Sequence, residues 1–286
     1  MNFFEDIYFN RKPDSIKSDF GKTLIIAGSK KYPGASFIAS QFAELAGVGY
    51  VALSVPETIY TIAASKVSNN IIYEFFSSGD DFKWSNDYSK VIKGYNSVLF
   101  GNGVNDSPLN LVFLKNLIAT ANNLVIDGTG LSIIANNVEI LKRDNKNKIL
   151  LTPHLGELKR LLKIDDCSRN PNDYLLKCKE FCQKYNVNVL IKSYSSILVL
   201  DNQTFLNSNY VPTPSLARAG SGDALAGYIT GLLAYATTKF DYQMVIMEAD
   251  KAIHEAAMKF SKINSDGTLN SNKLSLVLED LIRDCK

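Results

Sequence analysis

The chain has 286 residues, of which 46% are apolar and 21% are charged, so it is long enough for one large α/β domain with a substantial core. Its formal net charge is +2 and its basic residues are dispersed, which argues against a nucleic-acid partner. No apolar run reaches the ~20 residues needed to cross a bilayer, and residues 1–14 lack the layout of a secretory signal, so we expect no membrane association and a cytoplasmic location.

Short apolar runs alternate with helical patterns along the chain. Strands are predicted at TLIIAG (23–28) and YVALSV (50–55). Four further segments each begin with a predicted strand of four or five apolar residues and continue into a polar or glycine-rich loop: SVLFGNG (97–103), NLVIDGTG (123–130), KILLTPH (148–154) and NVLIKS (188–193). Apolar residues at helical spacing predict helices over 35–47, 108–121 and 172–185. Strands that are apolar throughout and separated by helices indicate an α/β fold with a mostly parallel sheet covered on both faces.

The C-terminal third has a different pattern. SILVLDNQTFLN at 196–207 predicts two strands joined by Asp201-Asn202, which would add an antiparallel hairpin near the sheet edge. From residue 221 onward the pattern is largely helical. We find no internal repeat, low-complexity tract or linker, so we predict a single domain over residues 1–286.

Ligands of open parallel sheets bind beyond the C-terminal ends of the strands. This rule gathers the loops that follow residues 27, 100, 126, 151 and 192 at one edge of the predicted sheet, and we expect the chemistry of the protein there.

The stretch LARAGSGDALAGYITGLLAYA, which begins at Leu216, contains the strongest candidate site. Glycines before an apolar helix allow backbone N–H groups to turn toward an anion at the positive end of the helix dipole. Asp223 beside such a site suits a general base that deprotonates a hydroxyl attacking a phosphoryl group. A Ser/Asp helix cap is the structural alternative.

The second candidate is LTPHLGELKRLL at 151–162. His154 follows a predicted strand at the ligand edge, and Gly156-Glu157 begins a helix, so His154 is either a ligand contact or part of a capping box with Glu157. The other histidine, His254, lies in a predicted helix interior, where packing is the favoured role.

Three further loops carry weaker signals. AGSKKYPGAS at 27–36 lacks both the dinucleotide fingerprint and the P-loop pattern, and FGNGV at 100–104 offers only close backbone approach. Asp127 ends a strand, where it could orient a metal, orient another loop or cap the following helix.

The four cysteines, at positions 167, 178, 182 and 285, do not form a metal-ligand pattern. Cys178 and Cys182 lie four residues apart on a predicted helix, but no second pair and no nearby histidine completes a site. We therefore expect reduced thiols, in agreement with a reducing compartment.

Taken in order, several segments resemble the ADP/ATP-dependent NAD(P)H-hydrate dehydratases of the ribokinase-like superfamily. They are AGSKKYPGASFIASQFAELAGVGYV, FGNGV, VIDGTGL, LLTPHLGELKRLL, VLIKS and ARAGSGDALAGYITGLLA. The resemblance covers residues 15–265, and the combination of TPH-x-GE with GSGD is specific, whereas GSGD alone also suits related kinases. It implies a three-layer α/β/α sandwich with a mostly parallel central sheet.

The resemblance implies a lyase that repairs the S form of hydrated NADH or NADPH, NADHX or NADPHX. ADP or ATP would phosphorylate the ring hydroxyl, and elimination of phosphate would restore NADH or NADPH. Asp223 would be the base, and backbone amides around Gly220, Ser221 and Gly222 would stabilise the transferring charge. Mg²⁺ would accompany the nucleotide, through protein ligands that the sequence does not identify.

The resemblance also implies binding residues on two sides of the site. Contacts with the hydrated cofactor are expected at Ala39 or its neighbour Ala35, and at Gly103, His154 and Asp223. The nucleotide is expected at Lys192, Ser193, Tyr194, Ser195, Ser196 and Gly222. Adenosine would lie over 192–196, with its phosphates toward 220–223.

Several segments depart from the family pattern. Asp127-Gly-Thr-Gly-Leu131 replaces D-A-D-A-L and lacks the second carboxylate, and Lys192-Ser193 replaces Lys-Gly. His154-Leu155-Gly156-Glu157 replaces H-P-G-E, and Gly101-Asn102-Gly103 replaces G-P-G. The loop TPSLARAGSGD lacks an expected asparagine and glycine. We expect these changes to affect substrate affinity and nucleotide preference more than the reaction.

Two other functions fit parts of the pattern. A small-molecule kinase of the same fold, acting on a thiazole, pyrimidine or sugar alcohol, would use the same Asp223 but stop at the phosphorylated product. A nucleotide-binding protein without catalysis would be expected to lose the base first, so the retained GSGD argues against it. TPH-x-GE favours the dehydratase.

The assembly and partners of the chain are less constrained by the sequence, which leaves homo-oligomerisation open. Because no epimerase-type domain precedes the predicted domain, any NAD(P)HX epimerase of the same pathway is expected to be a separate protein.

Overall fold

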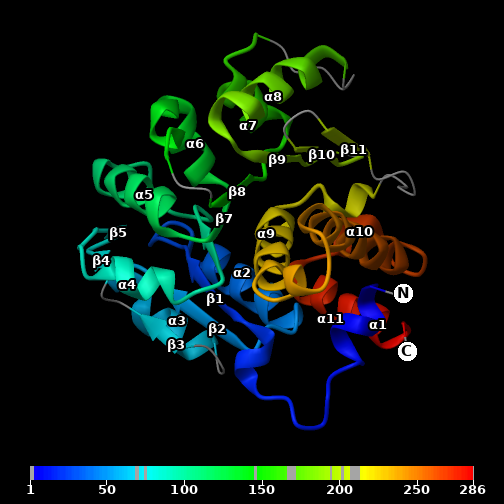
Figure 1. The fold of residues 1–286 in the computed structure, drawn as a ribbon. Coiled ribbons are helices and arrows are strands. Elements are labelled where there is room, and N and C mark those ends of the chain that lie inside the picture. Colours follow the sequence, from blue (N-terminus) through cyan, green and yellow to red (C-terminus); the bar gives the residue numbers. More distant parts are fainter. Residues whose placement is uncertain are drawn as a thin grey trace.

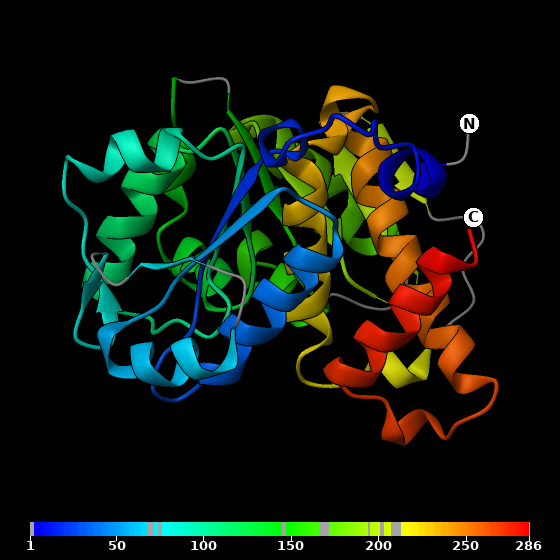
Figure 2. The ribbon, with the colours of Figure 1, turned by 90° about the horizontal axis from the view of Figure 1, so that it is seen from below.

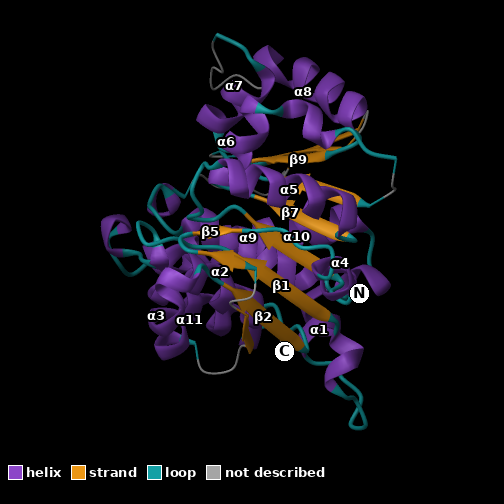
Figure 3. Ribbon diagram, turned by 90° about the vertical axis from the view of Figure 1, so that its left-hand side faces the viewer, coloured by secondary structure: helices purple, strands orange, loops and turns teal. Residues whose placement is uncertain are grey.

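The described part of the chain is built around one twisted sheet of nine strands (Figures 1 and 3). The computed structural model describes residues 3–67, 71–73, 76–144, 147–165, 172–193, 195–200, 203–206 and 213–285. The strand order is β11-β10-β9-β8-β7-β6-β1-β2-β3. The seven strands from β9 to β3 are parallel, and β10 and β11 continue the sheet as an antiparallel hairpin.

The strands of this sheet are β1 Lys22–Ile26, β2 Tyr50–Ser54, β3 Ile71–Tyr73, β6 Ser97–Phe100, β7 Asn123–Ile126, β8 Lys148–Leu151, β9 Asn188–Ile191, β10 Ile197–Leu200 and β11 Gln203–Leu206. A separate two-stranded sheet pairs β4 Ser77–Ser78 with β5 Asp81–Phe82.

Alternate residues of each central strand enter two different hydrophobic cores, because successive side chains point to opposite faces of a sheet. In β1, Ile25 packs into one core, whereas Leu24 and Ile26 pack into the other. All three are completely buried, which explains why the strands are apolar throughout.

Helices cover both faces of the sheet, in two layers that Figure 2 shows on either side of the strands. The core that includes Ile25 is closed by α1 Phe3–Tyr8, α2 Pro33–Leu45, α3 Tyr60–Lys66, α9 Ser221–Leu233, α10 Tyr242–Ser261 and α11 Ser271–Arg283. The opposite core is closed by α4 Tyr88–Lys93, α5 Pro108–Thr120, α6 Thr129–Asn136, α7 Leu155–Leu162 and α8 Asn172–Tyr185. The predicted α/β/α arrangement, with a mostly parallel sheet, is confirmed.

The predicted elements correspond closely to the observed ones. The helix expected over 35–47 begins two residues earlier, at Pro33, and the helices expected over 108–121 and 172–185 are α5 and α8. The hairpin is confirmed, with Ile197 opposite Leu206, while its predicted turn at 201–202 lies outside the described residues. The edge strand β3 and the small β4–β5 sheet were not predicted.

The C-terminal ends of β1, β6, β7, β8 and β9 lie at one edge, because these strands are parallel and adjacent. The structure therefore confirms that the loops after residues 27, 100, 126, 151 and 192 share an edge.

Two other sequence-based expectations concern bilayers and cysteines. None of the helices in the described ranges is both long and apolar enough to cross a bilayer. Cys178 and Cys182 are buried and Cys285 is half-buried, while Cys167 lies outside the described residues.

Helices α2 and α9 pack unusually closely, and this contact places the start of α9 at the functional edge. A methyl group on Gly227 of α9 would lie 2.1 Å from the carbonyl oxygen of Ala39 in α2, and one on Gly231 would lie 2.6 Å from that of Ala43. Glycine at these positions allows backbone-to-backbone contact between the two helices.

Gly227→Ala is therefore expected to destabilise the protein by about 1–3 kcal/mol, because the helices must separate to admit the methyl group. This loss should exceed the gain of up to about 1 kcal/mol from the higher helix propensity of alanine. Urea unfolding measures the change. The matched control is Gly34→Ala in α2, where no atom lies within 4 Å of the new methyl group. Equal stability of the two variants would contradict the close-packing explanation.

Candidate active site

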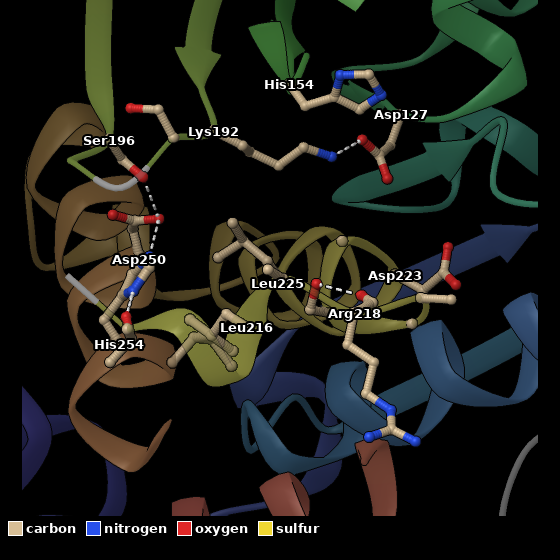
Figure 4. A pocket seen from close by; sticks show the side chains of 18 of the residues that line it. Asp127, His154, Lys192, Ser196, Leu216, Arg218, Asp223, Leu225, Asp250 and His254 are labelled. Atoms are coloured by element: carbon tan, nitrogen blue, oxygen red, sulfur yellow. Dashed lines mark hydrogen bonds and ion pairs between the residues drawn. The ribbon is translucent and has the colours of Figure 1, made fainter. Parts of the chain in front are cut away.

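A cavity of about 540 Å³ lies between the C-terminal edge of the sheet and the first turn of α9 (Figure 4). Loops after β7, β8 and β9 form one wall, and the segment before α9 together with α10 forms the other. Its lining residues are Asp127, His154, Lys192, Ser193, Ser196, Thr213, Pro214, Leu216, Ala217, Arg218, Ala219, Gly220, Ser221, Gly222, Asp223, Leu225, Asp250, Ile253 and His254.

Asp127, which directly follows β7, links the loops of four adjacent strands. Its Oδ1 accepts hydrogen bonds from Lys192 Nζ at 2.5 Å and from Thr152 Oγ1 at 2.8 Å, and its Oδ2 accepts one from Asn102 Nδ2 at 2.9 Å. Lys192 follows β9, Thr152 follows β8 and Asn102 follows β6. Of the three roles considered for Asp127, orientation of other loops is the one observed; α6 begins without a side-chain cap.

The ion pair between Asp127 and Lys192 is largely shielded from water, with side-chain exposures of 4% and 18%. Burial opposes the charge of Lys192, but the neighbouring carboxylates of Asp127 and Glu157 outweigh burial and raise the pKa of Lys192. Lys192 therefore supplies a fixed positive charge in the cavity wall, of the kind that binds phosphate oxygens.

The first turn of α9 presents backbone donors to the same cavity. Gly220 is the N-cap residue with φ of 95°, a left-handed conformation that favours glycine, and no side chain caps the helix. The amides of Gly222 and Asp223 have no helical carbonyl to donate to, because they belong to the first turn. Ser221 differs, because its amide and its hydroxyl both donate hydrogen bonds to the Arg218 carbonyl within the turn. The geometry thus favours an anion site over a Ser/Asp cap.

Asp223 lies in this first turn and is half-buried. Its Oδ1 accepts a hydrogen bond from Asn102 Nδ2 at 2.6 Å. Burial raises the pKa of Asp223 to about 6, from an ordinary value of 3.8; the Asn102 hydrogen bond opposes this rise and the Asp127 charge adds to it. A carboxylate that titrates near pH 6 is mostly ionised at neutral pH and is more basic than an ordinary aspartate, as a general base requires.

His154 caps helix α7, so the capping-box interpretation is confirmed. Its Nδ1 accepts hydrogen bonds from the Gly156 and Glu157 amides at 3.0 and 3.3 Å, and the Glu157 carboxylate accepts one from the His154 amide at 2.9 Å. The same side chain is 58% exposed and lines the cavity. Capping leaves the other face of the ring accessible to a ligand.

The far end of the cavity combines apolar side chains with a buried polar group. Ser196 donates to Asp250 at 3.0 Å, and Thr213 Oγ1 lies 2.6 Å from His254 Nδ1. Burial lowers the pKa of His254 to about 3, so this imidazole is neutral at physiological pH. The prediction that His254 packs in a helix interior is confirmed by its 9% exposure, but it also lines the cavity wall, which the sequence did not indicate.

The predicted nucleotide segment borders the same cavity. Lys192, Ser193, Ser196 and Gly222 line it, and Ser195 contributes a carbonyl that accepts a hydrogen bond from the Ser193 hydroxyl. Tyr194 lies outside the described residues.

Three of the predicted substrate residues differ in whether their surface is available to a ligand. Gly103 lies against Ala35, since a methyl group on Gly103 would be 2.8 Å from the Ala35 Cβ. Ala39, in contrast, is completely buried beneath α9. Its side chain has no surface to offer a ligand, so Ala35 is the member of the pair that we retain.

Asn102 is the functional candidate that sequence reasoning did not assign. The only signal was its presence where the family pattern has proline. Asp250 and Thr213 were also missed, because their side chains meet the cavity only after the C-terminal helices pack against the sheet.

A metal site formed by protein side chains alone is not found in the described ranges, where no group of three or more His, Cys, Asp or Glu side chains is arranged to hold an ion. Mg²⁺ commonly binds through one or two carboxylates together with substrate phosphates, and such a site requires the nucleotide.

Comparison with known proteins identifies a family. The family model described as NAD(P)H-hydrate dehydratase matches residues 23–278. A bifunctional NAD(P)H-hydrate repair enzyme Nnr of Salinibacter ruber is 30% identical over 231 residues, which are 78% of this chain and 42% of that protein. The chain therefore spans less than half the length of this relative. The ADP-dependent (S)-NAD(P)H-hydrate dehydratase of Staphylococcus aureus is 26% identical over 228 residues, covering 78% of this chain and 76% of the relative.

Solved structures agree on the fold. A ribokinase-like superfamily protein from Enterococcus faecalis has a TM-score of 0.80 at 20% identity, over 99% of this chain and 94% of the other. The ADP/ATP-dependent NAD(P)H-hydrate dehydratase of Bacillus subtilis, co-crystallised with ATP and Mg²⁺, has a TM-score of 0.76 at 20% identity, over 99% and 96%. The predicted ribokinase-like fold is confirmed.

Asp127→Asn is expected to lower the free energy of unfolding by about 3 kcal/mol, because it leaves the buried Lys192 ammonium without its main counter-charge. Urea unfolding at pH 7.5 measures the loss. Glu139→Gln is the control, since it removes a pair with Lys142 in which both side chains are 62% exposed, and no resolvable change is expected there. If Asp127→Asn is as neutral as this control, the ion pair does not stabilise the edge.

Proposed function

The chain belongs to the NAD(P)H-hydrate dehydratase family, and we propose that it restores NADH and NADPH from the S forms of NADHX and NADPHX in a nucleotide-dependent reaction. The observation that supports this most directly is the placement of Asp223. Its carboxylate has a raised pKa, lies in the first turn of α9 and borders a cavity that also holds Lys192.

The proposed reaction has two stages. Asp223 removes the proton from the ring hydroxyl of the hydrated cofactor while that oxygen attacks the terminal phosphoryl group of ADP or ATP. The nucleotide leaves with one phosphate fewer. The ring nitrogen lone pair then expels inorganic phosphate with cleavage of the carbon–oxygen bond, and loss of a proton from the adjacent ring carbon completes the dihydropyridine.

The backbone donors of the first turn of α9 would stabilise the charge during transfer. The amides of Gly222 and Asp223 and the positive end of the helix dipole act together on phosphoryl oxygens. Gly220 allows the turn that exposes these amides, whereas the amide and the hydroxyl of Ser221 both donate to the Arg218 carbonyl.

We assign the nucleotide to the 540 Å³ cavity, with its phosphates toward Gly220–Asp223 and its adenosine over Lys192–Ser196. Apolar contacts from Leu216, Leu225 and Ile253 suit a base, and Lys192 suits a phosphate. Mg²⁺ would enter with the nucleotide and neutralise charge on the transferring phosphoryl group.

The hydrated cofactor would bind on the other side of Asp223. Gly103 and Ala35, which lie against each other, would contact it from the loop after β6 and the first turn of α2. His154 would contact it from the N-terminus of α7.

The family match favours the dehydratase over a small-molecule kinase of the same fold, although both would use Asp223 in the same way. The two activities differ in the fate of the phosphorylated product, which eliminates phosphate in one and is stable in the other.

Three wider proposals accompany this function. We treat residues 1–286 as a single domain, because the helices of both cores pack on one sheet. We also propose an NAD(P)HX epimerase as a partner in the same pathway. The cytoplasmic location stays a prediction.

The proposed function is tested by the absorbance at 340 nm of the purified protein mixed with hydrated NADH, Mg²⁺ and either ATP or ADP. An increase that requires nucleotide is expected, since only the restored dihydropyridine absorbs there. Nucleotide consumption without an increase would instead indicate a kinase.

Asp223→Asn should reduce turnover by about 100-fold or more, the scale for loss of a well-placed general base, while nucleotide binding is retained. Asp14→Asn, at an exposed carboxylate, is the matched control and should be fully active. Near-normal turnover of the Asp223 variant would refute the assignment of the base.

The same variant should be more stable than the wild type at neutral pH. Because burial raises the folded-state pKa of Asp223 from 3.8 to about 6, its contribution to stability is complete below pH 3.8 and is lost as the pH rises through 6. Above that pH, Asp223→Asn should gain up to about 3 kcal/mol in unfolding free energy, and the gain should vanish below about pH 4.

A further inference from the structure

A single amide nitrogen joins two carboxylates at the centre of the site. Asn102 Nδ2 lies 2.6 Å from Asp223 Oδ1 and 2.9 Å from Asp127 Oδ2. An asparagine amide carries two hydrogens, so one can be donated to each carboxylate. Both amide hydrogens of Asn102 are therefore donated to carboxylates, one to Asp223 and one to Asp127.

The residue that makes this bridge is buried and anchored through its backbone. Asn102 is completely buried, and its backbone carbonyl accepts a hydrogen bond of 2.7 Å from the Gly28 amide in the loop after β1. The amide is therefore fixed between the loops of β1 and β7 and the first turn of α9. An exposed, mobile asparagine could not set the direction of a carboxylate in this way.

The bridge extends to the opposite wall of the cavity. Asp127 uses Oδ2 for Asn102 and Oδ1 for the Lys192 ammonium and the Thr152 hydroxyl. The chain of contacts from Lys192 through Asp127 and Asn102 ends at Asp223. These contacts connect Lys192, which we propose faces the nucleotide phosphates, to Asp223, the proposed base.

We propose that Asn102 is a positioning residue, which fixes the direction of the Asp223 carboxylate and keeps it ionised beside Asp127 by donating one amide hydrogen to each. Its proposed role concerns the reaction described above and rests on the proposed function only for the activity readout. The direction and ionisation of Asp223 are properties of the protein alone.

The charges around Asp223 explain why a donor is needed there. Burial raises the pKa of Asp223 to about 6, and the negative charge of Asp127 acts in the same direction. Against these, the Asn102 hydrogen bond has the largest lowering effect, followed by the positive charge of Lys192. Glu157 and His154, at the start of α7, face Lys192 from the far side. Loss of the amide should therefore favour protonated Asp223.

The test is the titration of Asp223 in Asn102→Ala, read from stability rather than from activity. In each background, the unfolding free energy is compared with and without Asp223→Asn over pH 4.5–8.5. The gap between the two opens above the unfolded-state pKa of about 3.8 and stops growing once the native carboxylate is ionised. The pH at which the gap levels off therefore reports the native pKa of Asp223, about 6 in the wild type. We expect this pH to rise by about one unit or more in Asn102→Ala, as expected when a charged group loses a hydrogen bond.

Activity provides a second readout. At pH 7, kcat should fall about 10- to 100-fold in Asn102→Ala, with the acid limb of the pH profile moved upward. The KM values for nucleotide and hydrated cofactor should change by less than about threefold, because the amide is buried behind the carboxylates. If the wild type shows no dehydratase activity, the proposed function fails while the stability titration still decides the role of Asn102.

The matched control is Asn105→Ala in the same loop. Asn105 Nδ2 also lies near two carboxylates, at 3.0 Å from Asp80 Oδ2 and 3.3 Å from Asp81 Oδ1, but outside the cavity. It should lower stability without moving the Asp223 titration or the acid limb. An equal shift in both variants would mean that loop stability, not the bridge, controls Asp223.

Asn102→Ser is the second variant, for use if Asn102→Ala does not fold. A serine hydroxyl has one hydrogen and can serve only one carboxylate, so a shift in the same direction but smaller is expected. An unchanged titration of Asp223 in either folded variant would overturn the proposal.

Discussion

The buried carboxylate of Asp127 is the constraint on which the functional edge depends. Parallel strands bring their C-terminal ends together whatever the loop sequences are, but loops diverge unless something joins them. Asp127 joins three of its neighbours by hydrogen bonds, from Asn102, Thr152 and Lys192. Since a buried carboxylate is costly unless it is paired and bonded, these partners and Asp127 are mutually required.

A second carboxylate is placed where the fold does not favour it. Asp223 lies beside Asp127 and is partly desolvated, so its ionised form reduces stability at neutral pH. The close contact of α2 with α9, through Gly227 and Gly231, anchors the helix that carries it. The well-packed body of the protein thus offsets the cost of a reactive group at its edge, a common arrangement in active sites.

Much of the fold and part of the site follow from local sequence patterns. Strand runs such as 123–130 and the hairpin at 196–207 could be predicted because continuous apolar residues and turn residues act over a few positions. The GSGD turn could be predicted for the same reason. Asn102 could not be assigned, because its role arises only when the loop of β6 meets Asp223, 121 residues later. The burial of Ala39 beneath α9 could not be predicted because it is a tertiary effect, and β3 is too short to have a pattern.

We propose that Asp223 starts a phosphoryl transfer whose product then loses phosphate. Phosphorus NMR of the wild-type protein with hydrated NADH, ATP and Mg²⁺ tests it most directly, because each phosphorus species is followed separately. ADP and inorganic phosphate should appear in equal amounts, in step with NADH, and no phosphate ester should accumulate. A persistent ester signal, with ATP consumed and no NADH formed, would contradict it.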